Sequence, residues 1–308
     1  VLSKYGKSIV SVHSYKPYNP TKKEWFITFF MSKLYLYSDA IVTVSKDIKS
    51  YLFNECKVNN VPIYSIYNFI DLVQVQTMST QKPNPEFNFL NSGPVLITVG
   101  RLVKEKGYNY FLRIVADIKK SKPDIKCIFI GDGDCRDQLL ELSSRLGLKV
   151  YIHSRDCKLE TKDDFDVFFM GTQDNPFQFF QYADLFVLSS LQEGMSIAIV
   201  EAMSLGLPVI SSDCRVGPRE LILNDSDYKR NSDDVIYGDY GVLCPAFNIE
   251  NDNSDISCSK HELLFSEAIR TLLNDKTTQE QYSIAGKQRA DAFSSEQIRL
   301  EWFELINR

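Results

Sequence analysis

Short apolar runs alternate with longer amphipathic segments over most of the chain. Runs of about three to seven largely apolar residues, bounded by glycine or polar residues, are typical of buried strands. Such runs lie at 9–12, 39–45, 63–68, 95–99, 127–130, 150–152, 167–170, 185–188, 208–211 and 241–245. Segments between them, such as residues 108–118, carry apolar side chains at helical spacing and predict helices. Strands alternating with helices in this way indicate an α/β fold with parallel sheets covered on both faces.

Residues 71–93 interrupt this rhythm with polar side chains and prolines, as a linker does. We therefore predict a first domain over 1–70, a linker over 71–93 and a second domain over 94–285. Two helices are predicted at 261–274 and 277–292, loops at 224–239 and 246–260, and a last helix in 286–308 that returns to the first domain. The first apolar run begins at residue 9 and the chain does not start with Met, so we expect the first domain to be incomplete.

Residues 21–38 combine aromatic side chains at helical spacing with several lysines. Two interpretations remain open: a helix packed on a sheet, or an amphipathic helix at a membrane surface. No apolar window is long enough to cross a bilayer.

The composition is that of a globular protein rather than a nucleic-acid binder. The chain has 308 residues, 44% hydrophobic and 24% charged, with a net charge of −5. A negative balance disfavours nucleic-acid partners, which attract clustered cations. The seven cysteines are scattered without a C-x-x-C pair, and together with three histidines they show no metal-ligand spacing. This pattern predicts free thiols in a reducing cytosol.

The most informative stretch is the turn that follows the run at 185–188. Glu193-Gly194-Met195-Ser196 precedes a helical segment that carries Glu201, and Ser196 is a candidate N-cap. The first N–H groups of a helix attract anions, and carboxylates accept hydrogen bonds from hydroxyls. A ligand with a central phosphate and hydroxyl-rich ends, such as a nucleotide sugar, suits this arrangement. The alternative is an ordinary strand-to-helix turn with a surface Glu.

Other candidate residues also follow strands. Arg101 and Lys106, after Gly100, suit the charge of a diphosphate, although surface solvation is the alternative. Gly131-Asp132-Gly133 is not a G-x-G-x-x-G motif and predicts a tight turn rather than a nicotinamide site. His13 follows the first run and is a candidate for a hydroxyl contact or proton transfer, or else a structural residue.

These motifs together resemble the retaining glycosyltransferases of family 4. The resemblance rests on the Glu-x7-Glu element of Glu193 and Glu201, the segments 99–107 and 206–210, and the glycines at 131 and 133. Asn175-Pro176 and residues 213–220 also resemble members that build capsular or exopolysaccharide repeats. The family has the GT-B architecture, in which two Rossmann-like domains face each other across a cleft. The resemblance implies that residues 1–70 are a partial acceptor-side domain and that residues 94–285 are the nucleotide-sugar-binding domain.

The resemblance implies a role for each matching residue. Arg101 and Lys106 would hold the donor diphosphate, Glu201 the ribose, and Glu193 the donor sugar. Backbone N–H groups of Gly194, Met195 and Ser196 would complete the phosphate cradle. His13 would face the sugar from the other domain. The remaining predicted donor-site positions are glycines at strand ends: Gly100, Gly131, Gly133 and Gly171. No metal or other cofactor is expected. Met195-Ser196 stands where many relatives have Phe-Gly, which leaves the sugar preference open.

The leading hypothesis is a metal-independent, retaining glycosyltransferase. It would move a hexose or N-acetylhexosamine from a nucleotide sugar, expected to be a UDP-sugar, to a glycan or lipid-linked glycan in surface polysaccharide synthesis. We expect it in the cytoplasm, with peripheral contact to the inner face of the membrane. Two alternatives remain: a GT-B-type nucleotide-sugar epimerase, and a truncated, non-catalytic UDP-sugar-binding fragment.

Overall fold

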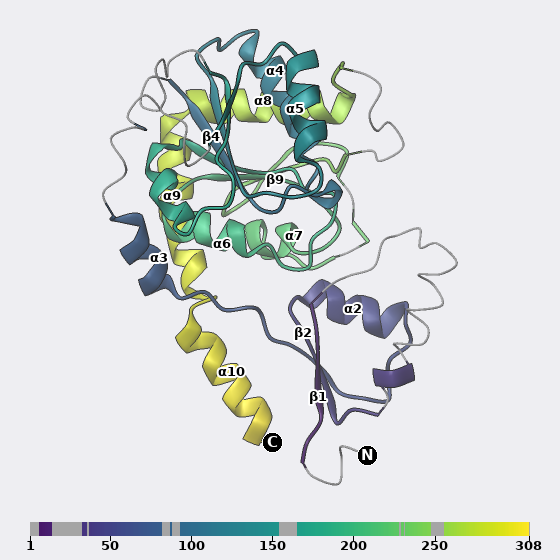
Figure 1. Ribbon diagram of the computed structural model, residues 1–308. Helices are drawn as coiled ribbons and strands as arrows, with labels where there is room; N and C mark the ends of the chain where they lie inside the picture. Colours follow the sequence, from purple (N-terminus) through teal and green to yellow (C-terminus); the bar gives the residue numbers. More distant parts are fainter. Residues whose placement is uncertain are drawn as a thin grey trace.

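The protein forms two α/β domains, each built on a mostly parallel sheet (Figure 1). The computed structural model describes residues 6–13, 33–35, 37–81, 87, 93–153, 165–227, 229–230, 232–247 and 256–307. Most of the segment 21–38, the end of the expected linker and much of the loop at 246–260 lie outside the described residues.

The larger domain contains an eight-stranded sheet in the order β10-β11-β9-β8-β4-β5-β7-β6. Its strands are β4 (Val95–Val99), β5 (Lys126–Ile130), β6 (Val150–Ile152), β7 (Val167–Phe169), β8 (Leu185–Leu188), β9 (Val209–Ser212), β10 (Ile236–Tyr237) and β11 (Val242–Cys244). All neighbours pair in parallel except β10, which is antiparallel to β11. Alternate residues of β4 and β5 enter two different apolar clusters, so both faces of the sheet are covered.

Helices cover the two faces separately (Figure 1). One face carries α4 (Tyr108–Lys119), α5 (Arg136–Arg145) and α8 (Lys260–Asn274). The other carries α3 (Leu72–Ser79), η4 (Pro176–Tyr182), α6 (Ile197–Ser204) and α7 (Pro218–Ile222). α9 (Lys276–Asp291) packs along α6, and the short helix η3 (Lys104–Lys106) follows β4.

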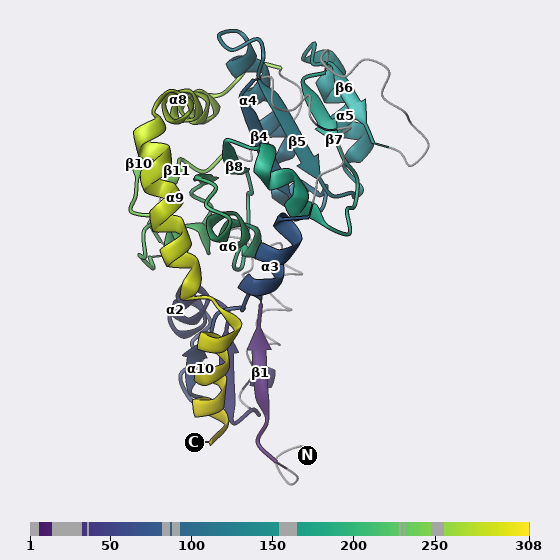
Figure 2. The ribbon, with the colours of Figure 1, turned by 90° about the vertical axis from the view of Figure 1, so that its left-hand side faces the viewer.

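The smaller domain has the strand order β1-β2-β3, all parallel. Its elements are β1 (Ile9–Val12), β2 (Ala40–Thr43), α2 (Lys46–Asn54) and β3 (Ile63–Ser65). The last helix, α10 (Ser295–Asn307), leaves the larger domain and runs beside this sheet (Figure 2). Its Ile298 and Leu305 are buried with Val42 and Ile66, so the end of the chain belongs to the core of the smaller domain.

The chain crosses between the domains at two adjacent places. The N–H of Ile70 donates to the carbonyl of Phe293 at 2.9 Å, and the N–H of Ser295 donates to the carbonyl of Ile70 at 3.1 Å. These backbone bonds tie the outgoing segment at 66–71 to the returning segment at 292–295.

The structure differs from the sequence-based prediction in two segments. The expected linker at 71–93 contains α3, because Asp71 caps its Gln74 N–H and Val75 is buried under the larger domain. The expected loop at 224–239 contains β10, whose backbone pairs with β11 although its side chains are half exposed or exposed. In both segments local polarity concealed a short element held by tertiary contacts.

Candidate active site

The candidate site lies where the strand order of the large sheet reverses. β4 and β8 are hydrogen-bonded neighbours, although almost ninety positions separate them in the sequence. From β4 the chain builds the sheet toward β6, and from β8 it builds toward β10. In open α/β sheets ligands bind outside the carboxyl ends of the strands at such a reversal. The turns after β4 and β8 are therefore the first place to look for chemistry.

These two turns are joined by backbone and side-chain hydrogen bonds. Ser189 Oγ donates to the carbonyl of Lys106 at 2.8 Å, and the N–H of Leu191 donates to the carbonyl of Glu105 at 2.8 Å. Gly107 has a left-handed φ of 60°, and a Cβ there would meet the carbonyl oxygen of Ser189 at 2.2 Å. Only glycine permits this approach, so the turns form one rigid unit.

An ion pair spans the junction of the two turns. Lys106 Nζ lies 2.6 Å from Glu193 Oε1, and Ser190 Oγ donates to the same oxygen at 2.6 Å. The side chain of Glu193 is 8% exposed and that of Lys106 is 22% exposed. Two residues predicted to bind different parts of a donor thus contact each other directly.

The start of α6 lies next to this pair. Ser196 occupies the N-cap position, but its hydroxyl makes no capping hydrogen bond, which corrects the expectation from the sequence. That hydroxyl is buried and has no hydrogen-bond partner among the described residues. The first turn of α6 therefore lacks a capping hydrogen bond from the Ser196 side chain, and an anion is a suitable partner for N–H groups at a helix start.

Glu201 lies one turn into α6 and is half buried. Burial raises the pKa of its carboxyl to about 7. A carboxyl with this pKa is partly protonated near neutral pH, so a ligand that donates hydroxyl hydrogen bonds to it would favour the ionised form.

Two of the predicted site residues are exposed to solvent. Arg101 and His13 are both exposed, and Arg101 forms no ion pair with any carboxylate in the described part of the chain. His13 Nε2 is hydrogen-bonded to Ser11 Oγ at 2.9 Å. His13 follows β1 of the smaller domain, so of these two only Arg101 shares a strand end with Lys106.

The strand-end glycines serve different purposes. A Cβ on Gly131 would meet the carbonyl oxygen of Gly100 at 2.0 Å, and one on Gly133 would meet that of Leu102 at 2.6 Å. The N–H of Gly100 also donates to the carbonyl of Ile130 at 2.9 Å. Gly131 and Gly133 are thus explained by close backbone packing, whereas a Cβ on Gly171 would meet open space.

Sequence reasoning assigned no role to several residues that shape the site. Ser189 and Ser190 fix the turn through the bonds described above, and Ser212 Oγ donates to the carbonyl of Ser190 at 2.5 Å. Gly217, at φ 97°, lies against the Glu193–Gly194 turn. For Ser189 and Ser190 the available signal was their position directly after the apolar run at 185–188.

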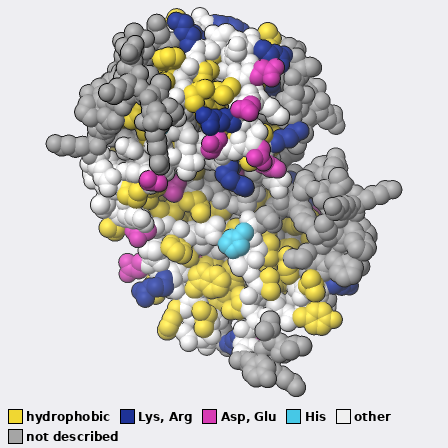
Figure 3. Space-filling model, in the orientation of Figure 1, with side chains coloured by type: hydrophobic (Ala, Val, Ile, Leu, Met, Phe, Trp, Pro, Cys, Tyr) yellow, Lys and Arg dark blue, Asp and Glu magenta, His cyan; other side chains and the backbone are white. Residues whose placement is uncertain are grey.

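On the face shown in Figure 3, side chains of both charges are interspersed on the larger domain, while hydrophobic side chains gather on the smaller domain. No group of three or more potential metal-ligating side chains is found among the residues that the structure describes. Within the same residues, no helix is long and apolar enough to cross a bilayer.

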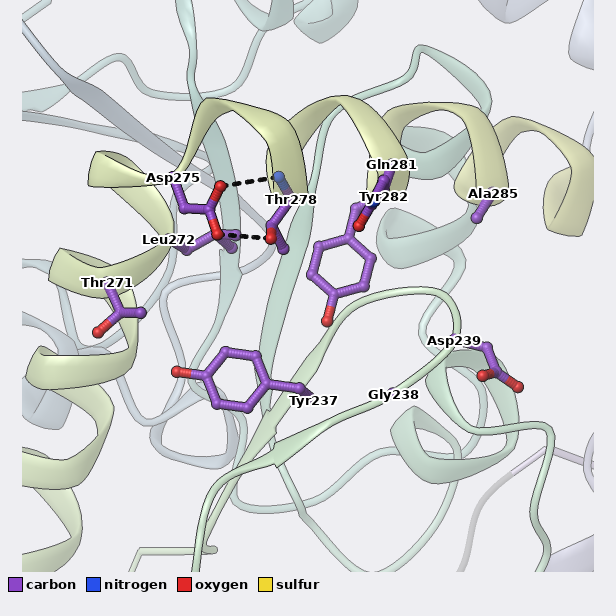
Figure 4. Close-up of a pocket in the computed structure, with 10 residues that line it drawn as sticks. All are labelled: Tyr237, Gly238, Asp239, Thr271, Leu272, Asp275, Thr278, Gln281, Tyr282 and Ala285. Carbon is purple, nitrogen blue, oxygen red and sulfur yellow. Dashed lines mark hydrogen bonds between the residues drawn. The ribbon is translucent and has the colours of Figure 1, made fainter.

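A separate cavity of about 460 Å³ lies away from the strand ends, between β10 and the junction of α8 with α9 (Figure 4). The rings of Tyr237 and Tyr282 line it. Its Asp275 is engaged as the cap of α9, because its carboxylate accepts hydrogen bonds from the N–H and Oγ of Thr278. The charged residues predicted from the sequence do not line this cavity.

The amino-acid sequence matches a known family and two glycosyltransferase relatives. Residues 81–234, half of the chain, match the family described as glycosyl transferases group 1. An uncharacterized glycosyltransferase of Methanocaldococcus jannaschii is 29% identical over 276 residues, covering 88% of this chain and 64% of the relative. An N-acetylgalactosaminyltransferase of Campylobacter jejuni, named for a diphospho-undecaprenol acceptor, is 25% identical over 88% of this chain and 60% of its own length. The chain therefore spans less than two thirds of either relative.

Solved structures agree in fold. Sucrose-phosphate synthase from Thermosynechococcus elongatus superposes with a TM-score of 0.69 at 19% identity, over 97% of this chain and 67% of that one. HepE of Anabaena, solved with UDP and glucose, gives a TM-score of 0.69 at 18% identity, over 97% of this chain and 71% of HepE. The predicted GT-B-like fold of Rossmann-like domains is confirmed by these neighbours. The matching family, the two-domain fold and the order of motifs agree, and the chain belongs to the group 1 glycosyltransferases, the family that its sequence resembles.

Proposed function

We propose that this protein is a retaining glycosyltransferase that moves a hexose or N-acetylhexosamine from a UDP-sugar to a glycan or lipid-linked glycan. The observation that carries the proposal is the Lys106–Glu193 ion pair at the reversal of strand order, beside the start of α6. Retention of configuration is inferred from the resemblance to family 4.

A diphosphate donor suits the charges of this site. Lys106, the exposed guanidinium of Arg101 and the start of α6 supply positive charge at adjacent strand ends. Structures similar in fold support UDP as the nucleotide, since HepE and the pneumococcal transferase GtfA were solved with UDP and a sugar.

The ion pair suggests how donor binding would proceed. A diphosphate arriving at Lys106 competes with Glu193 for the ammonium group. Once displaced, the Glu193 carboxylate keeps its hydrogen bond from Ser190 and turns its other oxygen to the sugar hydroxyls. As the glycosidic bond breaks, Lys106 and Arg101 stabilise the negative charge that develops on the leaving diphosphate. In this proposal cationic side chains stabilise the charge of the leaving diphosphate, and no metal is included.

The acceptor is proposed from the relatives. The Campylobacter jejuni relative is named for a lipid-linked acceptor, and lipopolysaccharide core transferases of Rhizobium meliloti are also similar. We infer a surface-glycan acceptor and a cytoplasmic enzyme that works at the inner face of the membrane.

Transfer from a panel of UDP-sugars tests the proposal with the full-length protein. Product formation is followed with lipid-linked and free glycan acceptors in the wild type, in Glu193→Ala and in Arg101→Ala. Lys104→Ala is the matched control, because Lys104 is close in sequence but lines a groove between α4 and α5. We expect transfer to fall by at least about a hundredfold in Glu193→Ala and about tenfold in Arg101→Ala, with the control unchanged.

Three results would contradict the proposal or its site. Unchanged transfer in both variants would remove the site assignment. An epimerised UDP-sugar formed without acceptor would identify an epimerase. UDP binding without turnover on any acceptor would leave a binding protein.

A further inference from the structure

Two consecutive residues of α7 serve different domains. Arg219 pairs with Asp213 inside the larger domain, and both side chains are almost fully buried. Glu220, the next residue, is 2% exposed and reaches across to the smaller domain. α7 is therefore anchored on one side of the domain boundary and bonded to the other.

Glu220 caps a helix that belongs to the other domain. Its Oε2 accepts a hydrogen bond from the N–H of Lys46 at 2.9 Å, and its Oε1 accepts one from the N–H of Asp47 at 2.8 Å. Ser45 Oγ accepts from the third N–H of α2, that of Ile48, at 3.0 Å. Two of the first three N–H groups of α2 are thus satisfied by a carboxylate from the larger domain, where the helix dipole favours negative charge.

A second contact from the smaller domain reaches the same carboxylate. Tyr67 Oη donates to Glu220 Oε2 at 2.8 Å, and its ring packs edge-on against Phe293 with centroids 5.2 Å apart. Arg289 of α9 donates to the carbonyl oxygens of Glu220 at 2.7 Å and of Leu221 at 3.3 Å. The carboxylate and its own backbone are both held, so this contact has one defined geometry.

α7 also contacts the candidate active site. Gly217, three residues before Glu220, lies so close to the Glu193 turn that a Cβ would meet the carbonyl oxygen of Gly194 at 3.3 Å and Glu193 Cβ at 3.6 Å. A short, rigid segment therefore joins the turn that carries Glu193 to the helix start of the other domain.

We propose that Glu220 is a positioning residue for glycosyl transfer: as an interdomain cap of α2, it fixes the smaller domain relative to the Glu193 turn. The inference rests on the proposed function and adds to it that the smaller domain presents the acceptor. Glu220 is almost fully buried and its carboxylate is bonded to α2 and Tyr67, so a substrate has no access to it, and its loss should separate transfer from donor binding.

The test compares Glu220→Ala, Glu220→Gln and Tyr67→Phe with the wild type in the full-length protein. Three quantities are measured: the UDP dissociation constant by calorimetry, kcat and KM for transfer, and hydrogen exchange at the amides of Lys46 and Asp47. In Glu220→Ala we expect UDP affinity within about twofold of the wild type, kcat lower by about tenfold or more, and exchange at both amides about tenfold faster. Glu220→Gln, which keeps one acceptor oxygen, recovers part of kcat.

Tyr67→Phe removes one hydrogen bond to Glu220 from the opposite domain and keeps the ring packing. It should lower kcat by a smaller factor than Glu220→Ala does. If Glu220→Ala does not fold, Tyr67→Phe tests the positioning role in its place. Unchanged kcat with faster exchange would overturn the positioning role, and so would a loss of UDP affinity that matches the loss of kcat. If the wild type transfers no sugar while exchange still responds to Glu220→Ala, the proposed function and the positioning role fail, and only the structural cap stands.

Discussion

Lys106 Nζ and Glu193 Oε1 lie 2.6 Å apart, although the two residues follow different strands of the large sheet. The contact exists because β4 and β8 are neighbours at the reversal of strand order. Each residue neutralises the charge of the other, and the proposed function requires a diphosphate to separate them.

Breaking the pair from either side should have opposite effects on donor binding. Lys106→Ala removes a cation from the diphosphate site, so we expect UDP to bind about tenfold to a hundredfold more weakly. Glu193→Gln keeps the acceptor oxygen for Ser190 but releases Lys106, so UDP should bind at least as tightly as in the wild type while transfer falls. Calorimetry with UDP measures both. Equal weakening in the two variants would show that the pair only supports the fold.

UDP affinity should depend on pH through Glu201. Its pKa is raised to about 7 by burial, so below pH 7 the carboxyl is largely protonated and cannot accept hydrogen bonds from both ribose hydroxyls. We expect UDP affinity to rise from pH 6 to pH 8 and then level off, by up to about tenfold per pH unit. Glu201→Gln should remove this dependence. An identical pH profile in the variant would exclude Glu201 from the nucleotide contact.

The two kinds of strand-end glycine should differ in stability. Gly131→Ala places a Cβ against the carbonyl oxygen of Gly100 at a φ of 135°, so we expect a loss of about 2–4 kcal/mol. Gly171→Ala, at a φ of 66° with open space around it, is the matched control and should lose only about 1 kcal/mol. Denaturant unfolding of both variants gives the two free energies. Equal losses of free energy would contradict the backbone contact between Gly100, after β4, and Gly131, after β5.

The domain contact should weaken as pH rises. Asp47 is buried beside Glu220, and Asp227 and Arg219 are also close enough to influence its charge. Burial first, and then the charge of Glu220, raise the pKa of Asp47 from 3.8 to about 8. A raised pKa means that the protonated form is favoured in the folded protein. The contribution of Asp47 to the free energy of unfolding is therefore fully present below pH 4 and is lost progressively as pH rises to about 8.

Asp47→Asn removes this titration. The difference in Tm between the variant and the wild type should grow from pH 4 to pH 8 and stay constant above that range. Glu55→Gln, at the other end of α2 in an exposed pair with Lys229, is the control and should show no such trend. A difference independent of pH would mean that Asp47 titrates normally.

The sequence predicted what depends on local pattern. The apolar runs that form β4, β5 and β8 are buried on both faces. A continuous apolar run predicts such a strand from the local sequence alone. The charged residues after them were identifiable because strand ends in parallel sheets gather ligands. α3 and β10 were missed because each is short and lies in a largely polar stretch, and because their order comes from packing against distant segments.

The pairings within the site could not be predicted. Nothing in the sequence says that Lys106 contacts Glu193 rather than solvent, because that depends on which strands are neighbours. Ser196 looked like a helix cap by residue type, yet its hydroxyl makes no capping bond. Glu220 carried no signal of its own, since its partners lie 153 to 174 positions away in the other domain.

A crystal structure of the full-length protein with UDP tests the central claim most directly. The account predicts the diphosphate at the start of α6, within hydrogen-bond distance of Lys106 Nζ and the Arg101 guanidinium, with the Lys106–Glu193 contact broken and Glu201 at the ribose. UDP bound elsewhere, or at this place with the 2.6 Å contact intact, would contradict it.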